Sequence, residues 1–242
     1  MKILAIDTSA VTAAAAVTED RKIIGNYSEN GLLTHSETML NMIENLLKNA
    51  HLTPDDIDLF AVSAGPGSFT GVRIGVSVIK GLAFGKEKPC VPVSTLDALA
   101  RNLEALAAPG TRFYACPVMD ARRNQLYCAL FLYETDPDGN TVYSRVWEDD
   151  MLSAAELSAK LEALDAPVYF VGDGCRVTEK TIRLPFAKEA PEILRYQSGY
   201  GVSRAAQTLY EKTEDRSAFT DLLLKPTYLR PSQAEREREN KE

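Results

Sequence analysis

The spacing of hydrophobic and polar positions predicts that the chain opens with a meander followed by an amphipathic helix. Short polar turns separate three apolar runs near the start. These runs predict strands over residues 2–7, 13–17 and 22–28. Apolar residues then recur at the i, i+3, i+4, i+7 spacing of a helix over residues 34–50. Thr34 and Glu37 fit a capping box, so they predict where this helix begins.

The next part of the chain alternates between strands and helices. Leu59 to Ala64 is an unbroken apolar run, which is typical of a strand buried on both faces. The pattern predicts a short turn or helix from residue 53, helices over 70–84 and 95–106, and a strand over 91–93. Strands that alternate with helices predict an α/β unit with a partly parallel sheet.

The order of predicted strands and helices begins again after residues 107–110, so this segment is the candidate linker between two domains. A second set of elements follows, with strands over 113–120, 125–134, 141–147 and 168–171 and helices over 153–164 and 203–212. Both halves run from a meander to alternating helices and strands, so we expect a duplicated α/β architecture. The predicted domains are 1–108 and 109–242, and the charged residues 233–242 are expected to form a solvated tail.

The helix over 70–84 carries paired glycines that need an explanation. Gly71, Gly75 and Gly81 lie inside this helix, and each glycine costs about 1 kcal/mol relative to alanine. Close backbone approach is the expected compensation. Arg73 and Lys80 share one face, which leaves most of the circumference free for burial. The glycines therefore approach either the protein's own core or a second element brought by a partner.

Composition and charge exclude several classes of protein. The chain has 242 residues, 45% hydrophobic content and a net charge of −7, which argues against a protein that binds nucleic acid by itself. The four cysteines show no Cys-x-x-Cys spacing and are expected to be free buried thiols of a cytoplasmic protein. We expect no signal peptide, since a strand begins directly after Met1, and no apolar run reaches the roughly 18 residues of a membrane span.

Several motifs together resemble a known family. They are Ile3–Ser9, His35–Glu37, Ser63–Gly75, Met119–Arg123 and Pro226–Arg230. This set is similar to the bacterial TsaB (YeaZ) family, and the resemblance spans nearly the whole chain. It implies an actin-like, Hsp70-like fold of two lobes, each with a mixed sheet flanked by helices. It also implies a role in making threonylcarbamoyladenosine at A37 of tRNAs.

The resemblance further implies partners rather than catalysis. In that family the protein is a non-catalytic scaffold or activator that binds the paralogous transferase TsaD as a heterodimer and also contacts the ATPase TsaE. It implies no cofactor, and contact with tRNA only through the complex. Homodimers are expected where the partner is missing.

The residues themselves offer no metal site. In relatives of the TsaD type, two histidines four residues apart follow the glycine-rich helix, and here Thr95 and Leu99 take those positions. The two histidines of the chain, His35 and His51, are sixteen residues apart and cannot share one helical face. His35 is expected to be a polar capping or surface residue.

Polar residues at strand ends allow two interpretations. Asp7, Thr8 and Ser9 lie where actin-like kinases hold phosphates, so they are either a vestigial nucleotide site or a strand-ending Asx turn. Gly172–Gly174 is similarly either a turn or a nucleotide contact. The segment Asp120–Arg123 is interpreted as a polar turn, because nothing supplies a nucleophile and base at a fixed spacing.

A small-molecule kinase or a metal-independent peptidase of the same fold remains the alternative. A kinase needs phosphate loops in both lobes, and a peptidase needs a Ser-His or Cys-His arrangement. Only two histidines are present, so the peptidase interpretation is the weaker one.

The helix over 34–50 has more apolar positions than one stripe needs, which predicts a partner interface. Leu40 and Leu47 flank its main apolar face, and glycine gaps on the following helix would let a neighbouring helix approach. The predicted interface residues are His35, Met39, Met42, Ile43, Leu46, Gly71, Arg73, Gly75 and Ile79.

Overall fold

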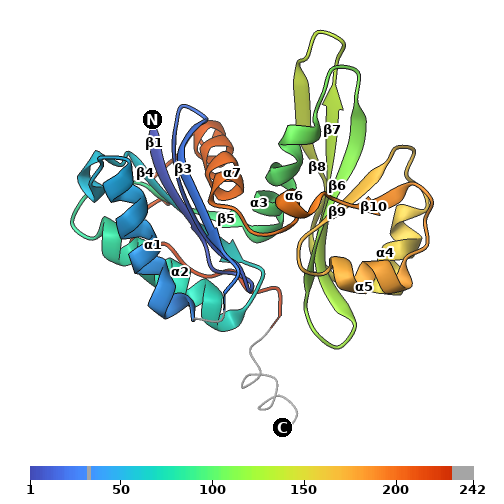
Figure 1. The fold of residues 1–242 in the computed structure, drawn as a ribbon, viewed down its shortest axis with the longest axis horizontal. Helices are drawn as coiled ribbons and strands as arrows, with labels where there is room; N and C mark the ends of the chain where they lie inside the picture. The colour runs from blue at the N-terminus through green and yellow to red at the C-terminus, as the bar shows by residue number, and fades with distance from the viewer. Residues whose placement is uncertain (32–33, 231–242) are drawn as a thin grey trace, which may run out of the picture.

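The computed structural model describes residues 1–31 and 34–230, which form two lobes (Figure 1). The first lobe is built on a five-stranded sheet of order β3-β2-β1-β4-β5. Its strands are β1 (Lys2–Asp7), β2 (Ala13–Glu19), β3 (Lys22–Glu29), β4 (Leu59–Gly65) and β5 (Cys90–Ser94). Neighbours among β1, β2 and β3 are antiparallel, whereas β4 and β5 run parallel to β1.

The second lobe repeats this arrangement with a sheet of order β10-β9-β6-β7-β8. Its strands are β6 (Arg112–Asp120), β7 (Gln125–Thr135), β8 (Thr141–Ser153), β9 (Val168–Val171) and β10 (Ala187–Glu189). β6, β7 and β8 form an antiparallel meander, and β9 and β10 run parallel to β6. The predicted fold class, two lobes with a mixed sheet each, is therefore confirmed.

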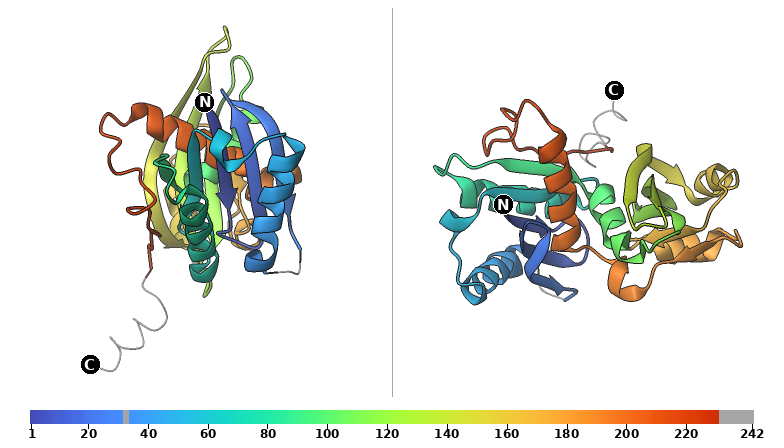
Figure 2. Two further views of the ribbon diagram at one scale, coloured as in Figure 1. Left: turned by 90° about the vertical axis from the view of Figure 1, so that its left-hand side faces the viewer. Right: turned by 90° about the horizontal axis from the view of Figure 1, so that it is seen from above.

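Helices cover both faces of the first sheet. α1 (His35–Asn49) and α2 (Phe69–Ala83) pack on the face that carries Leu4 and Ile6. α7 (Gly199–Lys212) packs on the opposite face, against Ile3 and Ala5, on the side of the second lobe (Figures 1 and 2). Successive side chains of a strand point to opposite faces, so a strand covered on both sides is apolar throughout.

The second sheet is also covered on both faces. α4 (Ala154–Leu161) and α5 (Cys175–Thr181) pack on one face. α3 (Thr95–Arg101) packs on the other, where Leu96 and Leu99 meet Phe113 and Phe131. Two 3₁₀ turns, η1 (Pro54–Asp56) and η2 (Asn102–Leu106), and the short α6 (Glu192–Arg195) complete the elements of the described residues. Among these residues, none of the helices combines the length and apolar character needed to cross a membrane.

Several elements of the structure depart from the sequence predictions. The helix predicted over 95–106 ends at Arg101 and continues as the 3₁₀ turn η2. β8 runs to Ser153 instead of ending at 147, and the last helix begins at Gly199 instead of 203. α5 was not predicted at all, because a helix of seven residues is too short to show a clear 3.6-residue period.

The predicted domain range 109–242 needs correction at its C-terminal end. α7 and the following segment pack on the first lobe, because the second face of that sheet would otherwise expose apolar strands. The Cys90 amide donates to the Phe219 carbonyl at 3.0 Å, and the Thr227 amide donates to the Ala64 carbonyl at 2.6 Å. The predicted tail, 233–242, lies outside the described residues.

Candidate functional site

α1 buries most of the residues that were predicted to meet a partner. The predicted capping box is present, with the Thr34 amide donating to the Glu37 carboxylate at 2.9 Å. The hydrogen bond from the Thr34 hydroxyl, together with this one from the Thr34 amide, lowers the pKa of Glu37. One face of α1 carries an apolar stripe of Met39, Met42, Ile43 and Leu46, which packs against the sheet. The exposed fractions on this stripe are 0% for Met39, 9% for Met42, 2% for Ile43 and 1% for Leu46. The lobe itself therefore covers these four residues, whereas Leu40 on the same helix stays exposed.

The glycines of α2 also face inward. A Cβ atom at Gly71 would lie 2.0 Å from the Thr8 carbonyl oxygen, and one at Gly75 would lie 2.5 Å from the Thr8 hydroxyl. The Thr8 hydroxyl donates to the Gly71 carbonyl at 2.7 Å. Ile79, on the same face, is fully buried. These glycines therefore admit the end of β1, which agrees with the alternative that they approach the protein's own core.

The outward side of the two helices forms a groove of about 420 Å³, which we call the outer groove. Its exposed apolar residue is Leu40, at 55% exposure. The groove is lined by His35, Ser36, Met39, Leu40, Thr70, Arg73, Ile74, Ser77 and Val78. His35 donates from Nε2 to the Ala10 carbonyl at 2.6 Å, which ties the start of α1 to the end of the β1 segment.

Arg73 joins the outer groove to the space between the lobes. Its guanidinium lies over the Phe69 ring at 3.8 Å and donates from Nε to the Tyr228 hydroxyl at 2.8 Å. The Phe69 and Tyr228 rings stack with their centroids 4.7 Å apart. Both rings line the interlobe cleft. The terminal motif of the sequence is thus held against α2 by stacking and cation–π contacts.

The polar end of β1 is a closed internal network. Asp7, Thr8, Ser9 and Ser63 are all fully buried. The Asp7 carboxylate accepts from the Ser9 amide at 2.8 Å and the Ser9 hydroxyl at 2.6 Å. Its other oxygen accepts from the Ser63 hydroxyl at 2.5 Å. Burial raises the pKa of Asp7, although these hydrogen bonds oppose the rise. The contacts favour the Asx-turn interpretation over a phosphate or metal site.

A cleft of about 550 Å³, which we call the interlobe cleft, lies between the two lobes. The β6–β7 turn contributes Arg122 and Arg123 to its lining. With Asn124, which follows them, these residues have φ angles of +66°, +56° and +59°. Such left-handed conformations are uncommon outside glycine. The Arg122 amide donates to the Asp120 carboxylate at 2.7 Å, so the predicted polar turn is confirmed. Arg230 donates to the Ala121 carbonyl at 3.1 Å on the same wall.

The turn after β9 approaches β6 closely. A Cβ atom at Gly172 would lie 2.1 Å from the Val118 carbonyl oxygen, so packing against β6 explains this glycine. Asp173 accepts from the Asp120 amide at 3.3 Å. Burial raises the pKa of Asp173. A turn packed against β6 therefore accounts for the glycine at position 172. Asp173, the next residue, lines the interlobe cleft.

The cysteine and histidine side chains form no metal-holding group among the described residues. Thr95 and Leu99 are buried, and His51 is exposed with a φ of +55°. In residues 1–31 and 34–230, no three His, Cys, Asp or Glu side chains are placed to hold a metal ion. The four cysteines are buried and free. Burial raises the pKa of Cys90, Cys128 and Cys175 to about 12, which leaves these thiols unreactive.

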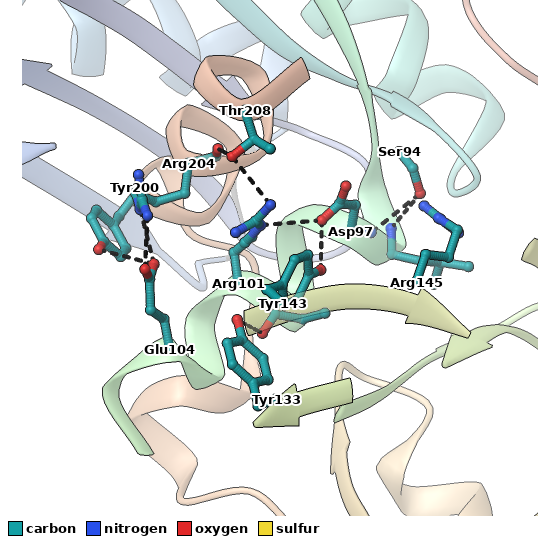
Figure 3. A network of polar contacts seen from close by, with 12 residues as sticks. Ser94, Asp97, Arg101, Glu104, Tyr133, Tyr143, Arg145, Tyr200, Arg204 and Thr208 are labelled. Carbon is teal, nitrogen blue, oxygen red and sulfur yellow. Dashed lines mark hydrogen bonds and ion pairs between the residues drawn. The ribbon is translucent and has the colours of Figure 1, made fainter. Parts of the chain in front are cut away.

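A polar network connects the lobes through α3 and η2 (Figure 3). Glu104 of η2 accepts two hydrogen bonds from Arg204 of α7, at 2.7 and 2.8 Å. Asp97 of α3 accepts from the Tyr143 hydroxyl of β8 at 2.7 Å and pairs with Arg101 at 3.4 Å. Bidentate charged hydrogen bonds of this kind are strong. The network therefore ties α7, which belongs to the first lobe, to the sheet of the second.

Both lobes share one sheet topology with helices on both faces, and this arrangement defines a two-lobed actin-like α/β protein. A family model described as TsaD, tRNA N6-adenosine threonylcarbamoyltransferase, matches residues 29–235. The tRNA threonylcarbamoyladenosine biosynthesis protein TsaB of Bacillus subtilis (strain 168) is 35% identical over 174 residues, 71% of each chain. The chain belongs to the TsaB (YeaZ) family of tRNA threonylcarbamoyladenosine biosynthesis proteins.

Two further comparisons relate this chain to its neighbours. A crystal structure from Pseudomonas aeruginosa, of an uncharacterized protein with similarity to peptidase YEAZ, covers 95% of this chain and 99% of its own, at a TM-score of 0.75 and 24% identity. This likeness shows the fold. A tRNA N6-adenosine threonylcarbamoyltransferase of Brachyspira hyodysenteriae is 37% identical over 119 residues, 43% of this chain and 34% of that protein.

Proposed function

We propose that this chain is a non-catalytic subunit that binds a TsaD-type transferase through the outer groove. The observation that carries the proposal is the exposed apolar side of α1 and α2. Leu40 is 55% exposed there, while Ile74 and Val78 are half-buried. Exposed apolar side chains in a groove rimmed by polar residues are typical of a protein interface. Of the interface residues predicted from the sequence, His35 and Arg73 line the outer groove and belong to the proposed interface. Met39 also lines the groove, but as a buried residue of its floor.

Similarity to the transferase family supports a paired arrangement. The matching segment, residues 29–235, includes both α1 and α2. A transferase that carries counterparts of these helices would present a similar face. Two similar faces pack around an approximate two-fold axis, so the contact would join four helices. The same geometry allows two copies of this chain to form a homodimer where the transferase is missing.

The closed network at β1 supports a role without catalysis. The Asp7 carboxylate, at the end of β1, already accepts hydrogen bonds from Ser9 and Ser63. A small-molecule kinase would need that carboxylate free for a metal ion. With a net charge of −7, contact with tRNA would come through the assembled complex. The proposed assembly includes the ATPase TsaE, and the buried free thiols suit a reducing, cytoplasmic compartment.

Two matched variants test the interface. Leu40→Asp places a charge on the outer groove, and Val142→Asp places one at a similarly exposed site, 60% accessible, on β8 of the other lobe. By isothermal titration calorimetry against a TsaD-type transferase, Leu40→Asp should weaken binding by about 2 kcal/mol or more, the scale of an interface hot spot. Val142→Asp should bind as the unaltered chain does. Equal affinities for the two variants would place the interface elsewhere.

A further inference from the structure

A second groove, of about 600 Å³, lies along one edge of the first sheet, and we call it the edge groove. β3 is the end strand of that sheet, and α1 lies beside it (Figures 1 and 2). Residues 26–29 of β3 line the groove together with one side of α1. Successive side chains of a strand point to opposite faces, so consecutive residues can share one groove only along the edge of their own strand. The edge groove therefore follows the backbone of β3.

The edge of β3 is regular where it lines this groove. Residues 25–29 pair with residues 13–17 of β2 without a break, and the irregularity in this pairing lies before Gly25. In an antiparallel pair, alternate residues turn their N–H and C=O groups away from the partner strand. Proteins usually block such an edge with a charge, a proline or a bulge, yet residues 25–28 are uncharged and include no proline. This stretch can therefore accept a further strand.

The α1 wall of the edge groove presents hydrogen-bond acceptors. Asn41 and Asn45 are exposed there, one helical turn apart. Asn41 donates from Nδ2 to the Glu37 carbonyl at 3.1 Å, and Asn45 donates from Nδ2 to the Asn41 carbonyl at 2.8 Å. Both contacts use the side-chain nitrogen, which leaves the side-chain oxygens as acceptors. Glu29 and Glu37 add carboxylates, and the lining includes no lysine or arginine. The groove therefore favours a ligand rich in donors and positive charge.

The floor of the edge groove is largely apolar. Met42 is 9% exposed there, and Tyr27 packs against the core of the lobe. The Tyr27 hydroxyl accepts from Asn49 Nδ2 at 2.7 Å, which holds the ring in place. At Gly25 a Cβ atom would lie 2.5 Å from Leu46 Cδ1, so α1 lies closest to β3 at this end. The groove therefore offers an apolar contact near its closed end and carboxylates toward Glu29.

We propose that the edge groove binds an extended, basic segment of another protein, which adds to the first sheet as a further strand beside β3. Strand addition of this kind gains affinity from backbone hydrogen bonds and specificity from alternate side chains. On the side facing α1, an apolar side chain would pack on Met42 and Tyr27, and a lysine or arginine would meet Glu29 and Glu37. A second copy of this chain lacks this complementarity, because its own residues 25–29 carry Glu29 and no cation.

The edge groove is separate from the outer groove. The two grooves share none of their lining residues, although both use α1. One chain could therefore hold a transferase and a basic segment at the same time. The proposal concerns the isolated chain and does not depend on the proposed function.

Calorimetry on the purified chain tests the proposal with three synthetic peptides whose ends are blocked. The peptide Thr-Lys-Thr-Val-Thr-Lys places its basic and apolar side chains on one face of a strand. It should bind with a dissociation constant below about 1 mM. A second peptide carries glutamate in place of both lysines, and a third keeps the basic sequence but has a methyl group on every backbone nitrogen. Both should bind at least about tenfold more weakly, because the second reverses the charge and the third cannot donate backbone hydrogen bonds.

Matched charge reversals locate the contact. Glu29→Lys alters the edge groove, whereas Glu44→Lys alters another exposed carboxylate, on α1 but outside the lining. The two variants have the same net charge, so a difference between them reports a local contact. Glu29→Lys should weaken binding of the basic peptide at least about fivefold and strengthen binding of the glutamate peptide. Glu44→Lys should bind both peptides as the unaltered chain does.

Amide hydrogen exchange followed by NMR locates the added strand directly. Alternate residues of 25–29 should exchange at least about tenfold more slowly when the basic peptide is bound. Unchanged exchange across these residues in a formed complex would contradict strand addition.

Three further results would overturn the proposal. The first is no binding of the basic peptide at millimolar concentration. The second is equal affinity for the basic and the methylated peptides, which would mean that charge alone attracts them. The third is a homodimer in sedimentation velocity that Glu29→Lys disrupts, which would assign the edge to a second copy of this chain. None of these measurements includes a transferase, so the proposed function stands or falls separately.

Discussion

The two faces of the helix pair α1 and α2 both carry apolar residues, but only the inward face buries them fully. The inward face carries Met39, Gly71 and Ile79 at full burial against the sheet. The outward face exposes Leu40 and half-exposes Val78 over the outer groove. The comparison teaches that an excess of apolar residues indicates an interface only for those the protein's own core leaves uncovered. Paired glycines indicate close approach, and here the approaching element is the end of β1.

The largest expected effect is a loss of stability when alanine replaces a glycine on the inward face of α2, but not when it replaces an exposed glycine of the same helix. Gly71→Ala should destabilise the protein by about 4 kcal/mol or more, since its Cβ would lie 2.0 Å from a backbone oxygen. Gly81→Ala is the control, because nothing lies within 4 Å of a Cβ there. Alanine should stabilise the helix at that exposed position by about 0.5–1 kcal/mol. Urea denaturation followed by circular dichroism measures both, and a Gly71→Ala protein of unchanged stability would contradict the inward placement.

A charge on each face should separate folding from binding. Met42→Asp places a carboxylate at a 9% exposed position in the core and should cost about 3 kcal/mol of unfolding free energy. Leu40→Asp, two residues earlier on the outward face, should change stability by less than about 0.5 kcal/mol. Thermal and urea unfolding of both variants provide the comparison. If both lost stability equally, the outward face would be part of the core.

A smaller effect concerns Asp7, beneath the inward face. Burial raises its folded-state pKa, so above the unfolded value of 3.8 the folded protein keeps a proton that the unfolded chain has lost. This contribution to stability therefore falls as the pH rises from about 3.8 to the raised folded-state pKa. An asparagine at position 7 cannot ionise, so the stability of the Asp7→Asn protein should not fall with pH in this way. At neutral pH the substitution should change stability by about 1 kcal/mol. Urea titrations at a series of pH values measure the slope, and identical slopes for both proteins would contradict the buried assignment.

Local patterns were sufficient to predict most of the fold. The meander β1–β3, the capping box of α1 and the second meander follow from turn residues and hydrophobic periods that act over a few residues. The return of α7 to the first sheet could not be predicted this way. It depends on contacts such as that between the hydroxyls of Thr18 and Ser203, 185 residues apart, which leave no local signal.

The candidate sites were harder to predict for the same reason. Ser63 lies inside the predicted strand over 59–64, and only the fold brings its hydroxyl to Asp7. Asn41 and Asn45 lie on the polar side of an amphipathic helix, where side chains ordinarily face water. Their place in the edge groove results from the position of β3 at the end of the sheet, so no periodicity or motif in the sequence could identify it.

The most direct test of the outer groove is protection of a single thiol. The four native cysteines are buried and should not react with maleimide. Ser77 of α2 is exposed in the outer groove, so Ser77→Cys would provide one reactive thiol there. Ser144 of β8 is exposed outside the groove, so Ser144→Cys provides a matched control. Rates of maleimide labelling are measured with and without a TsaD-type transferase. The account predicts that the transferase slows labelling of Ser77→Cys at least about tenfold and leaves Ser144→Cys unchanged. Unchanged labelling of Ser77→Cys in a formed complex would contradict it.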